Sequence, residues 1–131
     1  MIKFIIDYSG GVPIYRQIID QIRFGIASGQ LKLGEQLPTV RALAVELKVN
    51  LNTVSKAYKE LEIRKILETQ QGTGTFINQT EQVISEEEKS NKLKDICQQA
   101  SMVALQYGFT IEDMIQELKD FTIKYVDENK E

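Results

Sequence analysis

The stretch that decides the fold is "VNLNTVSKAYKELE", residues 49–62. Its apolar residues recur at the 3.6-residue period of a helix, which predicts a helix with one buried stripe. That stripe consists of Val54, Ala57, Tyr58 and Leu61. Asn50 stands directly before the helix, where its side chain can cap the first turn. The opposite face presents an amide, a hydroxyl and two ammonium groups, carried by Asn52, Ser55, Lys56 and Lys59.

This outward face suits the reading of DNA. Asparagine can pair with the edge of adenine, and serine or threonine can contact a base or a phosphate. Lysines further along the helix can meet phosphates, and the N-terminal end of a helix itself favours anions. The alternative is an ordinary solvated face that follows a capping asparagine. Taken alone, the face supports these two interpretations equally.

Three elements are predicted before this helix. The segment "KFIID", residues 3–7, is predicted to form a short strand. Pro13 stands where a helix would start, isoleucines follow at four-residue steps, and Gly29 is expected to end the helix. A turn-rich connection then leads to a short helix that Thr39 can cap. The apolar face of this short helix is Val40, Leu43, Ala44 and Leu47.

A hairpin is predicted after residue 62. Residues 66–69 and 75–77 are expected to be two strands joined by "QQGTG". Three helices and a hairpin predict a winged helix-turn-helix, a mostly α fold with a small β-wing. Gly72 and Gly74 would let the wing approach a sugar–phosphate chain, and Thr73 and Thr75 would supply hydroxyl donors. A plain hairpin turn is the alternative, whereas a P-loop would need a Gly-Lys-Ser/Thr run that opens a helix.

The composition changes after Asn78, which predicts a DNA-binding domain over residues 1–79 and a helical tail over residues 80–131. Ser85 with Glu88, and Thr110 with Asp113, match the capping boxes of two helices. Both helices carry a long apolar stripe that so short a tail cannot bury alone. We expect the stripes to pack on a second copy of the chain, with packing on the first domain as the alternative. The predicted dimerisation residues are Leu93, Ile96, Ala100, Val103, Tyr107, Met114, Leu118 and Tyr125.

The composition argues against an enzyme. The chain of 131 residues has no histidine and one cysteine, which removes the commonest general base, the commonest metal ligand and any internal disulfide. Cys97 lies on the apolar stripe and is expected to be a small core residue. No cofactor or metal is predicted. No apolar run approaches the roughly 20 residues of a membrane span, and the chain is expected to be cytoplasmic.

The net charge of −3 is unevenly distributed. Residues 1–79 hold ten Lys and Arg against seven Asp and Glu, a net charge of +3, whereas residues 80–131 have a net charge of −6. The first part can therefore approach a polyanion and the second cannot, although so small an excess does not by itself establish binding to nucleic acid.

Several ordered motifs resemble the DNA-binding domain of GntR-family transcriptional regulators. They are "PIYRQI", "GEQLPTVRALA", "VNLNTVSKAYKELE" and "GTGTF", and the resemblance spans residues 12–77. The two-helix tail resembles that of the YtrA subfamily. The resemblance implies a DNA contact through the arginine of the "LPTVR" motif, which is Arg41 and is preceded by Thr39, and through a wing glycine, Gly72 or Gly74. It also implies contacts from Asn50, Leu51, Asn52, Thr53 and Ser55.

Some positions depart from the family pattern. Many members carry arginines where this chain has Leu51 and Ser55, and basic residues where the wing has Gln70, Gln71 and Thr73. The glycine that often ends the third helix is replaced here by Lys65. The helix is therefore expected to run on or to end in a left-handed residue.

The sequence thus predicts a sequence-specific DNA-binding transcriptional regulator. We expect a homodimeric repressor whose third helices enter successive major grooves of a pseudo-palindromic operator, about 34 Å apart. The alternative is a winged-helix module that binds protein instead of DNA, which the small positive charge and the neutral wing tip favour. The sequence leaves open whether a small-molecule effector binds.

Overall fold

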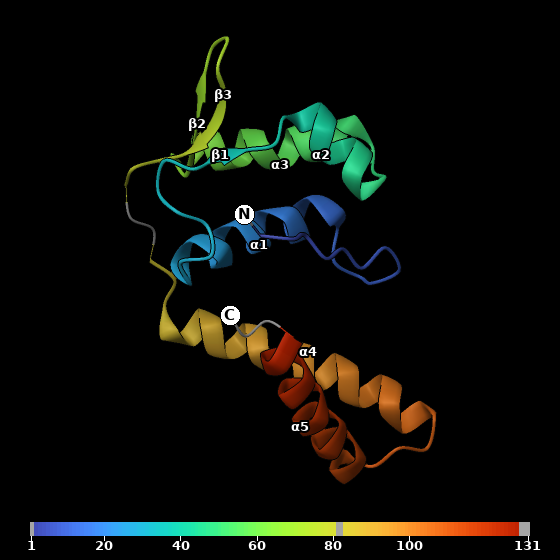
Figure 1. The fold of residues 1–131 in the computed structure, drawn as a ribbon. Helices are drawn as coiled ribbons and strands as arrows, with labels where there is room; N and C mark the ends of the chain where they lie inside the picture. Colours follow the sequence, from blue (N-terminus) through green and yellow to red (C-terminus); the bar gives the residue numbers. More distant parts are fainter. Residues whose placement is uncertain (1, 81–82, 129–131) are drawn as a thin grey trace. The chain divides into compact units, whose positions relative to one another are not determined.

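The chain forms two compact units, residues Met1–Ile84 (unit 1) and Ser85–Glu131 (unit 2). The computed structural model describes residues 2–80 and 83–128, with side chains up to residue 124. Unit 1 contains helices α1, α2 and α3 and strands β1, β2 and β3, and unit 2 contains helices α4 and α5 (Figure 1). The predicted fold class, mostly helical with a small β-wing, is confirmed.

Helix α1 (Ile14–Ala27) supplies much of the core of unit 1. Three of its four evenly spaced isoleucines, Ile18, Ile22 and Ile26, are buried. Pro13 precedes the first helical residue, a position where the N–H that proline lacks is not needed. Gly29 has a φ of +82° just after the helix, and the Leu31 N–H then donates to the carbonyl of Gly25 at 2.9 Å. The predicted helix and its glycine stop are both present.

The prediction of a strand at residues 3–7 was wrong. The segment is extended, but it has no strand partner among the described residues. Two glutamine side chains of α1 take the place of a partner strand. The Gln21 amide accepts from the Ile5 N–H at 3.0 Å and donates to the Ile5 carbonyl at 2.6 Å. The Gln17 amide makes the same pair of bonds with Asp7, each at 2.9 Å.

Helices α2 (Val40–Leu47) and α3 (Leu51–Ile63) form the helix-turn-helix. The turn begins at Lys48, a non-glycine residue with a φ of 56°. The Val49 N–H donates back to the Ala44 carbonyl at 3.0 Å, which closes the end of α2. The Tyr8 hydroxyl also donates to the Leu47 carbonyl, so the N-terminal segment is bonded to this turn. Leu43, Ala44 and Leu47 are buried as predicted, and Val40 is half-buried.

A small antiparallel sheet completes unit 1, in the order β1-β3-β2. The bounds of strands β2 (Leu67–Gln70) and β3 (Gly74–Ile77) lie within one residue of those predicted for the hairpin, which projects beyond the helices of unit 1 in Figure 1. Strand β1 (Gln36–Leu37) was not predicted. It pairs Gln36 with Phe76 and Leu37 with Thr75, so β3 is the central strand.

Lys65 follows α3 with a φ of 62°, so the helix ends in a left-handed residue, one of the two outcomes expected from the missing glycine. The Lys65 N–H donates to the Glu62 carbonyl at 2.9 Å, and the Ile66 N–H donates to the Leu61 carbonyl at 2.9 Å. A lysine in this conformation costs about 1–2 kcal/mol relative to the right-handed region. The chain then turns directly into β2.

One apolar core joins these elements. The predicted stripe of α3 is fully inside it, because Val54, Ala57 and Leu61 have no exposed surface and Tyr58 is 2% exposed. The buried Tyr58 hydroxyl donates to the Pro38 carbonyl at 2.7 Å, which satisfies the phenol. Burial raises the pKa of Tyr58 above its ordinary value of 10.0, and the charge of Glu46 raises this pKa further.

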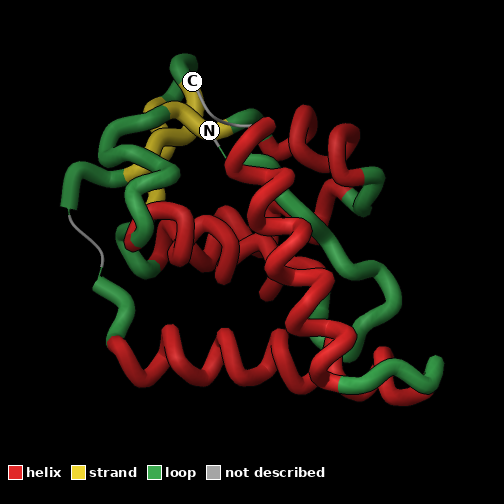
Figure 2. Tube along the Cα trace, turned by 60° about the horizontal axis from the view of Figure 1, so that its bottom comes forward, coloured by secondary structure: helices red, strands yellow, loops and turns green. Residues whose placement is uncertain are grey.

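Unit 2 consists of α4 (Glu86–Gln106) and α5 (Ile111–Glu128), joined by a short loop (Figure 2). Both predicted caps are present. The Ser85 hydroxyl accepts from the Glu88 N–H at 3.1 Å, and Thr110 and Asp113 exchange two bonds at 2.9 and 3.1 Å. No residue of α4 is buried. Cys97 is exposed, so its prediction as a core residue is wrong for the single chain.

Candidate nucleic-acid interface

The outward face of α3 is assembled as predicted. Asn52, Ser55, Lys56 and Lys59 line one shallow hollow together with Glu60 and Ile63. The side chains of Asn52, Lys56 and Lys59 are exposed, and Ser55 is half-buried. Ile63 is 81% exposed, so an apolar group follows the lysines at the end of this face. The face therefore offers an amide, a hydroxyl, two cations and one apolar contact along a single helix.

The two predicted capping residues fix the starts of α2 and α3. The Thr39 hydroxyl accepts from the Ala42 N–H at 3.0 Å, and the Asn50 amide oxygen accepts from the Asn52 N–H at 2.8 Å. Each cap uses an acceptor and leaves a donor, the hydroxyl hydrogen of Thr39 and the amide NH₂ of Asn50. Both side chains are exposed and can donate to an anion such as a phosphate.

Arg41 lies in the first turn of α2 and is exposed. Its guanidinium makes no hydrogen bond or ion pair with any residue that the structure describes. At the start of α3, Leu51 is 43% exposed, and Thr53 is half-buried. A free guanidinium beside the helix-turn-helix is suited to bind phosphate or a guanine edge in two-pronged fashion.

Tyr15 of α1 lies beside the outward face of α3, a contact that was not predicted from the sequence. The Lys56 ammonium lies 4.0 Å from the centre of the Tyr15 ring, in the range of a cation–π contact. The Arg16 guanidinium lies 5.9 Å from the same ring centre. Only the packing of α1 on α3 brings Lys56 to the Tyr15 ring, so spacing within the sequence could not identify this contact.

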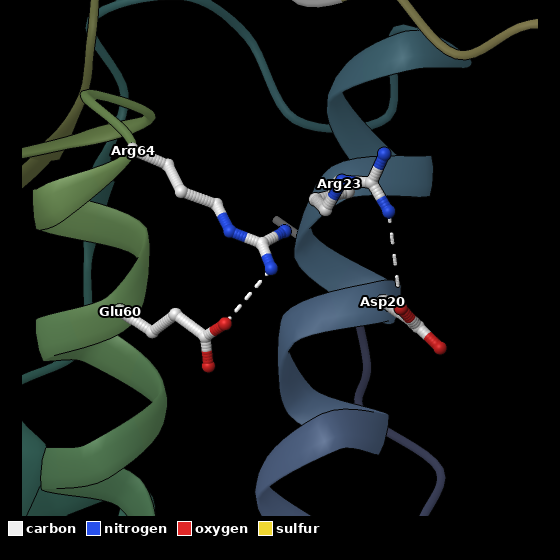
Figure 3. Close-up of polar contacts among 4 residues, drawn as sticks. All are labelled: Asp20, Arg23, Glu60 and Arg64. Atoms are coloured by element: carbon white, nitrogen blue, oxygen red, sulfur yellow. Dashed lines mark hydrogen bonds and ion pairs between the residues drawn. The ribbon is translucent and has the colours of Figure 1, made fainter.

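Both acidic side chains near the end of α3 are occupied. The Arg64 guanidinium pairs with Glu60 at 2.8 Å (Figure 3). The Glu62 carboxylate accepts from the Thr69 hydroxyl of β2 at 2.6 Å, and Thr69 lies 3.4 Å from the Thr75 hydroxyl of β3. These contacts attach the wing to α3. Thr75 lies on β3, the central strand of the sheet, where it pairs with Leu37 of β1 and Thr69 of β2.

The two wing glycines lie in different environments. Gly72 is at the exposed tip with a φ of +81°, and an added Cβ would meet no atom within 4 Å. Gly74 is half-buried with a φ of +135°, and an added Cβ would lie 2.5 Å from the Gln36 amide nitrogen. That amide donates to the carbonyl of Thr73 at 3.0 Å. Gly72 and Thr73 thus form the open tip, while Gly74 makes room for the Gln36 amide that supports it.

The predicted dimerisation residues belong to unit 2, and four of them, Ile96, Ala100, Val103 and Tyr107, line one shallow hollow. Leu93, Ile96, Val103, Tyr107 and Leu118 are all more than half exposed. Ala100 is exposed and Met114 is half-buried, whereas the side chain of Tyr125 lies outside the described residues. Within the described part of the chain, this apolar surface is not covered by the pairing of α4 with α5.

Neither a metal site nor a membrane-spanning helix is found among the described residues. No group of three or more His, Cys, Asp or Glu among them could hold a metal ion. None of the described helices is sufficiently long and apolar to cross a membrane.

Known proteins are similar to this chain in sequence and in fold. The family model "Bacterial regulatory proteins, gntR family" matches residues 14–77. The HTH-type transcriptional regulator YhcF of Bacillus subtilis (strain 168) is 35% identical over 116 residues, 88% of this chain and 95% of the relative. The HTH-type transcriptional repressor YtrA of the same organism is 38% identical over 117 residues, 89% of this chain and 90% of the relative. The chain belongs to the GntR family.

Solved structures of GntR regulators extend this result to the fold. YtrA from Sulfolobus acidocaldarius, a GntR-family transcription factor, matches 92% of this chain and 97% of its own at 32% identity, with a TM-score of 0.53. A GntR family transcriptional regulator from Listeria monocytogenes matches 88% of this chain and 98% of its own at 32% identity, with a TM-score of 0.54. The predicted family is confirmed, and this GntR protein is a transcriptional regulator and not an enzyme.

Proposed function

We propose that this GntR regulator binds a pseudo-palindromic DNA operator as a homodimer and represses transcription by occupying it. The observation that carries the proposal is the outward face of α3. It holds Asn52, Ser55, Lys56 and Lys59 in one outward-facing row on the helix that directly follows the turn of the helix-turn-helix. The second helix of a helix-turn-helix ordinarily lies in the major groove, where small polar side chains can contact base edges and cations can contact phosphates.

In this proposal α3 lies in the major groove and Asn52 reads a base. Its amide is exposed in the first turn, and an asparagine amide can bond both the N6 and N7 positions of adenine. Asn50, Thr53 and Ser55 lie at the same end of the helix, where short side chains let the helix sit deep in the groove. Lys59 is one turn or more further along, where a long cationic side chain reaches phosphate.

Helix α2 and the wing would contact the DNA phosphate backbone on either side of the groove that α3 enters. Arg41 is exposed and has no partner among the described residues, and the Thr39 hydroxyl keeps a free hydrogen while it caps α2. At the wing, Gly72 and Thr73 form the tip that enters or borders the minor groove. We assign Gly74 and Thr75 a supporting role, since both are half-buried within the sheet.

The tail would join two copies of the chain. Its apolar stripes are exposed on both α4 and α5, although residues of this size are ordinarily buried. A self-complementary pairing of the tails would create the two-fold symmetry that a pseudo-palindromic operator mirrors, with the two α3 helices about 34 Å apart. Repression is supported by the similar protein YtrA of Bacillus subtilis, which is named a transcriptional repressor.

The test separates the reading of bases from the binding of phosphate. An operator is first selected from random duplexes with the full chain, and binding is then measured on that operator and on random DNA at one salt concentration. Asn52→Ala should cost roughly 1–3 kcal/mol on the operator and little on random DNA, because a base contact is lost. Arg41→Ala should weaken both alike, because phosphates carry no sequence information. Asn91→Ala, an exposed asparagine on α4, is the matched control and should change neither.

Two outcomes would contradict these roles. If Asn52→Ala lowered both affinities equally, Asn52 would bind phosphate or act only through the start of α3. If Arg41→Ala affected the operator alone, Arg41 would itself read a base, most naturally guanine.

A second candidate function is a winged-helix module that binds protein. The wing tip favours it, because Gln70, Gln71 and Thr73 carry no charge, and the excess of +3 over residues 1–79 is small. The two functions differ in their response to salt. A DNA-binding protein shows nonspecific binding to random duplex that falls steeply as salt increases, whereas a protein-binding module shows none.

A further inference from the structure

Two cations of unit 1 share one aromatic ring. Lys56 of α3 and Arg16 of α1 lie 4.0 and 5.9 Å from the centre of the Tyr15 ring, so the two charges are at most about 10 Å apart. Both cationic side chains are exposed, and the ring is half-buried between them and the core. An aromatic face attracts cations through its quadrupole, which explains how the ring can hold two of them.

Neither cation forms an ion pair with a residue that the structure describes. No carboxylate of the described residues lies within 4.0 Å of Arg16 or Lys56. Arg23, further along α1, and Arg64, directly after α3, differ, because Arg23 lies 4.0 Å from Asp20 and Arg64 lies 2.8 Å from Glu60 (Figure 3). Residue numbers rise in the same direction along both helices in that view. The paired arginines thus lie toward the ends of α1 and α3, and the unpaired cations lie nearer the start of α1.

The position of Arg16 is unfavourable unless an anion is present. It lies in the first turn of α1, which has no acidic residue, and a cation there opposes the helix dipole. Its attraction to Tyr15 also brings it toward Lys56, a like charge. Negative charge close to both cations would reduce each of these penalties.

We propose that Tyr15 is a positioning residue that holds Arg16 and Lys56 against neighbouring phosphates of one DNA strand, which makes α1 a third element of the DNA interface. This inference rests on the proposed function. Lys56 belongs to the outward face of α3, so the Tyr15 ring borders the surface that would meet DNA, and Arg16 adds a cation of α1 beside the same ring.

The spacing suits the DNA backbone better than a single small anion. Phosphates of one strand follow each other at about 3.4 Å of rise along the duplex axis. Two cations at most about 10 Å apart can therefore each meet a phosphate on the same strand without moving from the ring. Arginine is also suited to contact phosphate through two parallel N–H bonds.

The experiment compares five variants of the full chain, one of them Lys59→Ala on the outward face of α3, on random duplex and on the selected operator over a range of salt. Arg16→Ala should reduce the slope of log affinity against log salt by about 0.9 on both DNAs, the value of one phosphate contact. Arg23→Ala is the matched control, an arginine on the same helix that already faces Asp20, and should leave the slope unchanged. Tyr15→Leu should weaken binding about two- to fivefold, whereas Tyr15→Phe keeps the ring and should bind like the parent.

Each outcome decides a different point. An unchanged slope in Arg16→Ala, with an unchanged melting temperature, would overturn the third contact. If Tyr15→Phe were as weak as Tyr15→Leu, the hydroxyl and not the ring would act, and the cation-holding role would be overturned. A parent chain with no salt-dependent binding to either DNA would instead contradict the proposed function. If Lys59→Ala weakened binding while Arg16→Ala did not, the proposed function would stand and this inference alone would fail.

Discussion

Helices α3 and α4 carry the same kind of apolar stripe, yet only one of them is covered. In α3 the stripe residues Val54, Ala57 and Leu61 have no exposed surface, because α1, α2 and the sheet surround them. In α4, which is longer, no residue is buried, and Leu93 is 62% exposed. The comparison shows that periodicity identifies the apolar face of a helix without identifying what covers it.

The first prediction removes the proposed partner of unit 2. The double variant Met114→Asp/Leu118→Asp would place two charges in the apolar interface. We expect the dimer to dissociate into monomers, with a free energy of association weaker by about 4 kcal/mol or more. Sedimentation at several concentrations measures this change. Gln98→Asp/Gln116→Asp is the control, because it adds two charges on helix faces away from the stripes. A test variant that stays a full-strength dimer would place the interface elsewhere.

The second prediction concerns the closed core of unit 1. Leu61→Ala should lower the free energy of unfolding by roughly 3 kcal/mol, because it leaves a cavity under a fully buried side chain. Urea unfolding measures the loss. Leu93→Ala, made in the monomeric background of the first prediction, should cost less than about 0.5 kcal/mol, since that leucine is exposed in the single chain. Equal costs would mean that the stripe of α4 is buried within one chain.

The third prediction uses the buried phenol of unit 1. Tyr58→Phe should lower stability at pH 7 by about 1 kcal/mol through the lost bond to the Pro38 carbonyl. Burial raises the pKa of Tyr58 in the folded state, so its contribution is fully present below pH 10.0 and is lost as the pH rises above that value. The stability of the parent should therefore fall more steeply than that of Tyr58→Phe between pH 10 and 11. Parallel curves would mean that the phenol titrates normally.

The smallest expected effect compares how the helices of the two units end. Lys65 after α3 and Gly108 after α4 are both left-handed, with φ of 62° and 81°. Lys65→Gly should raise the free energy of unfolding of unit 1 by up to about 1 kcal/mol, and Gly108→Ala should lower that of unit 2 by about as much. An added Cβ at Gly108 meets no atom within 4 Å, so the loss would report backbone strain alone. Thermal melts of the two variants provide the measurement.

Local signals in the sequence were sufficient for most of the fold. The caps at Thr39, Asn50, Ser85 and Thr110 need only a side chain and the first turn that follows it, and all four are present. The two-residue strand β1 has no alternation to detect. The error at residues 3–7 has a similar cause, because the apolar pattern was correct for an extended segment but the bonding partners are side chains of α1.

The candidate site could be predicted as far as it lies on one helix. The helical spacing of Asn52, Ser55, Lys56 and Lys59 is sufficient to place these residues on one face, where the structure has them. The contact of Lys56 with Tyr15 joins residues 41 positions apart, and the bond of Gln36 to the wing joins residues 37 positions apart. Such contacts depend on how elements pack, and the spacing of residues within one element does not contain that information.

The glutamine bonds to the N-terminal segment have a consequence for the order in which the chain loses its structure. The backbone N–H groups of Ile5 and Asp7 donate to the side-chain oxygens of Gln21 and Gln17. These side chains can change rotamer and break the bonds while α1 stays intact. Exchange of these two hydrogens with solvent would therefore report the detachment of the segment from α1, a smaller opening than the unfolding of the core. The same opening would free the Tyr8 hydroxyl from the Leu47 carbonyl, so detachment of this segment would also release one tether of the helix-turn-helix.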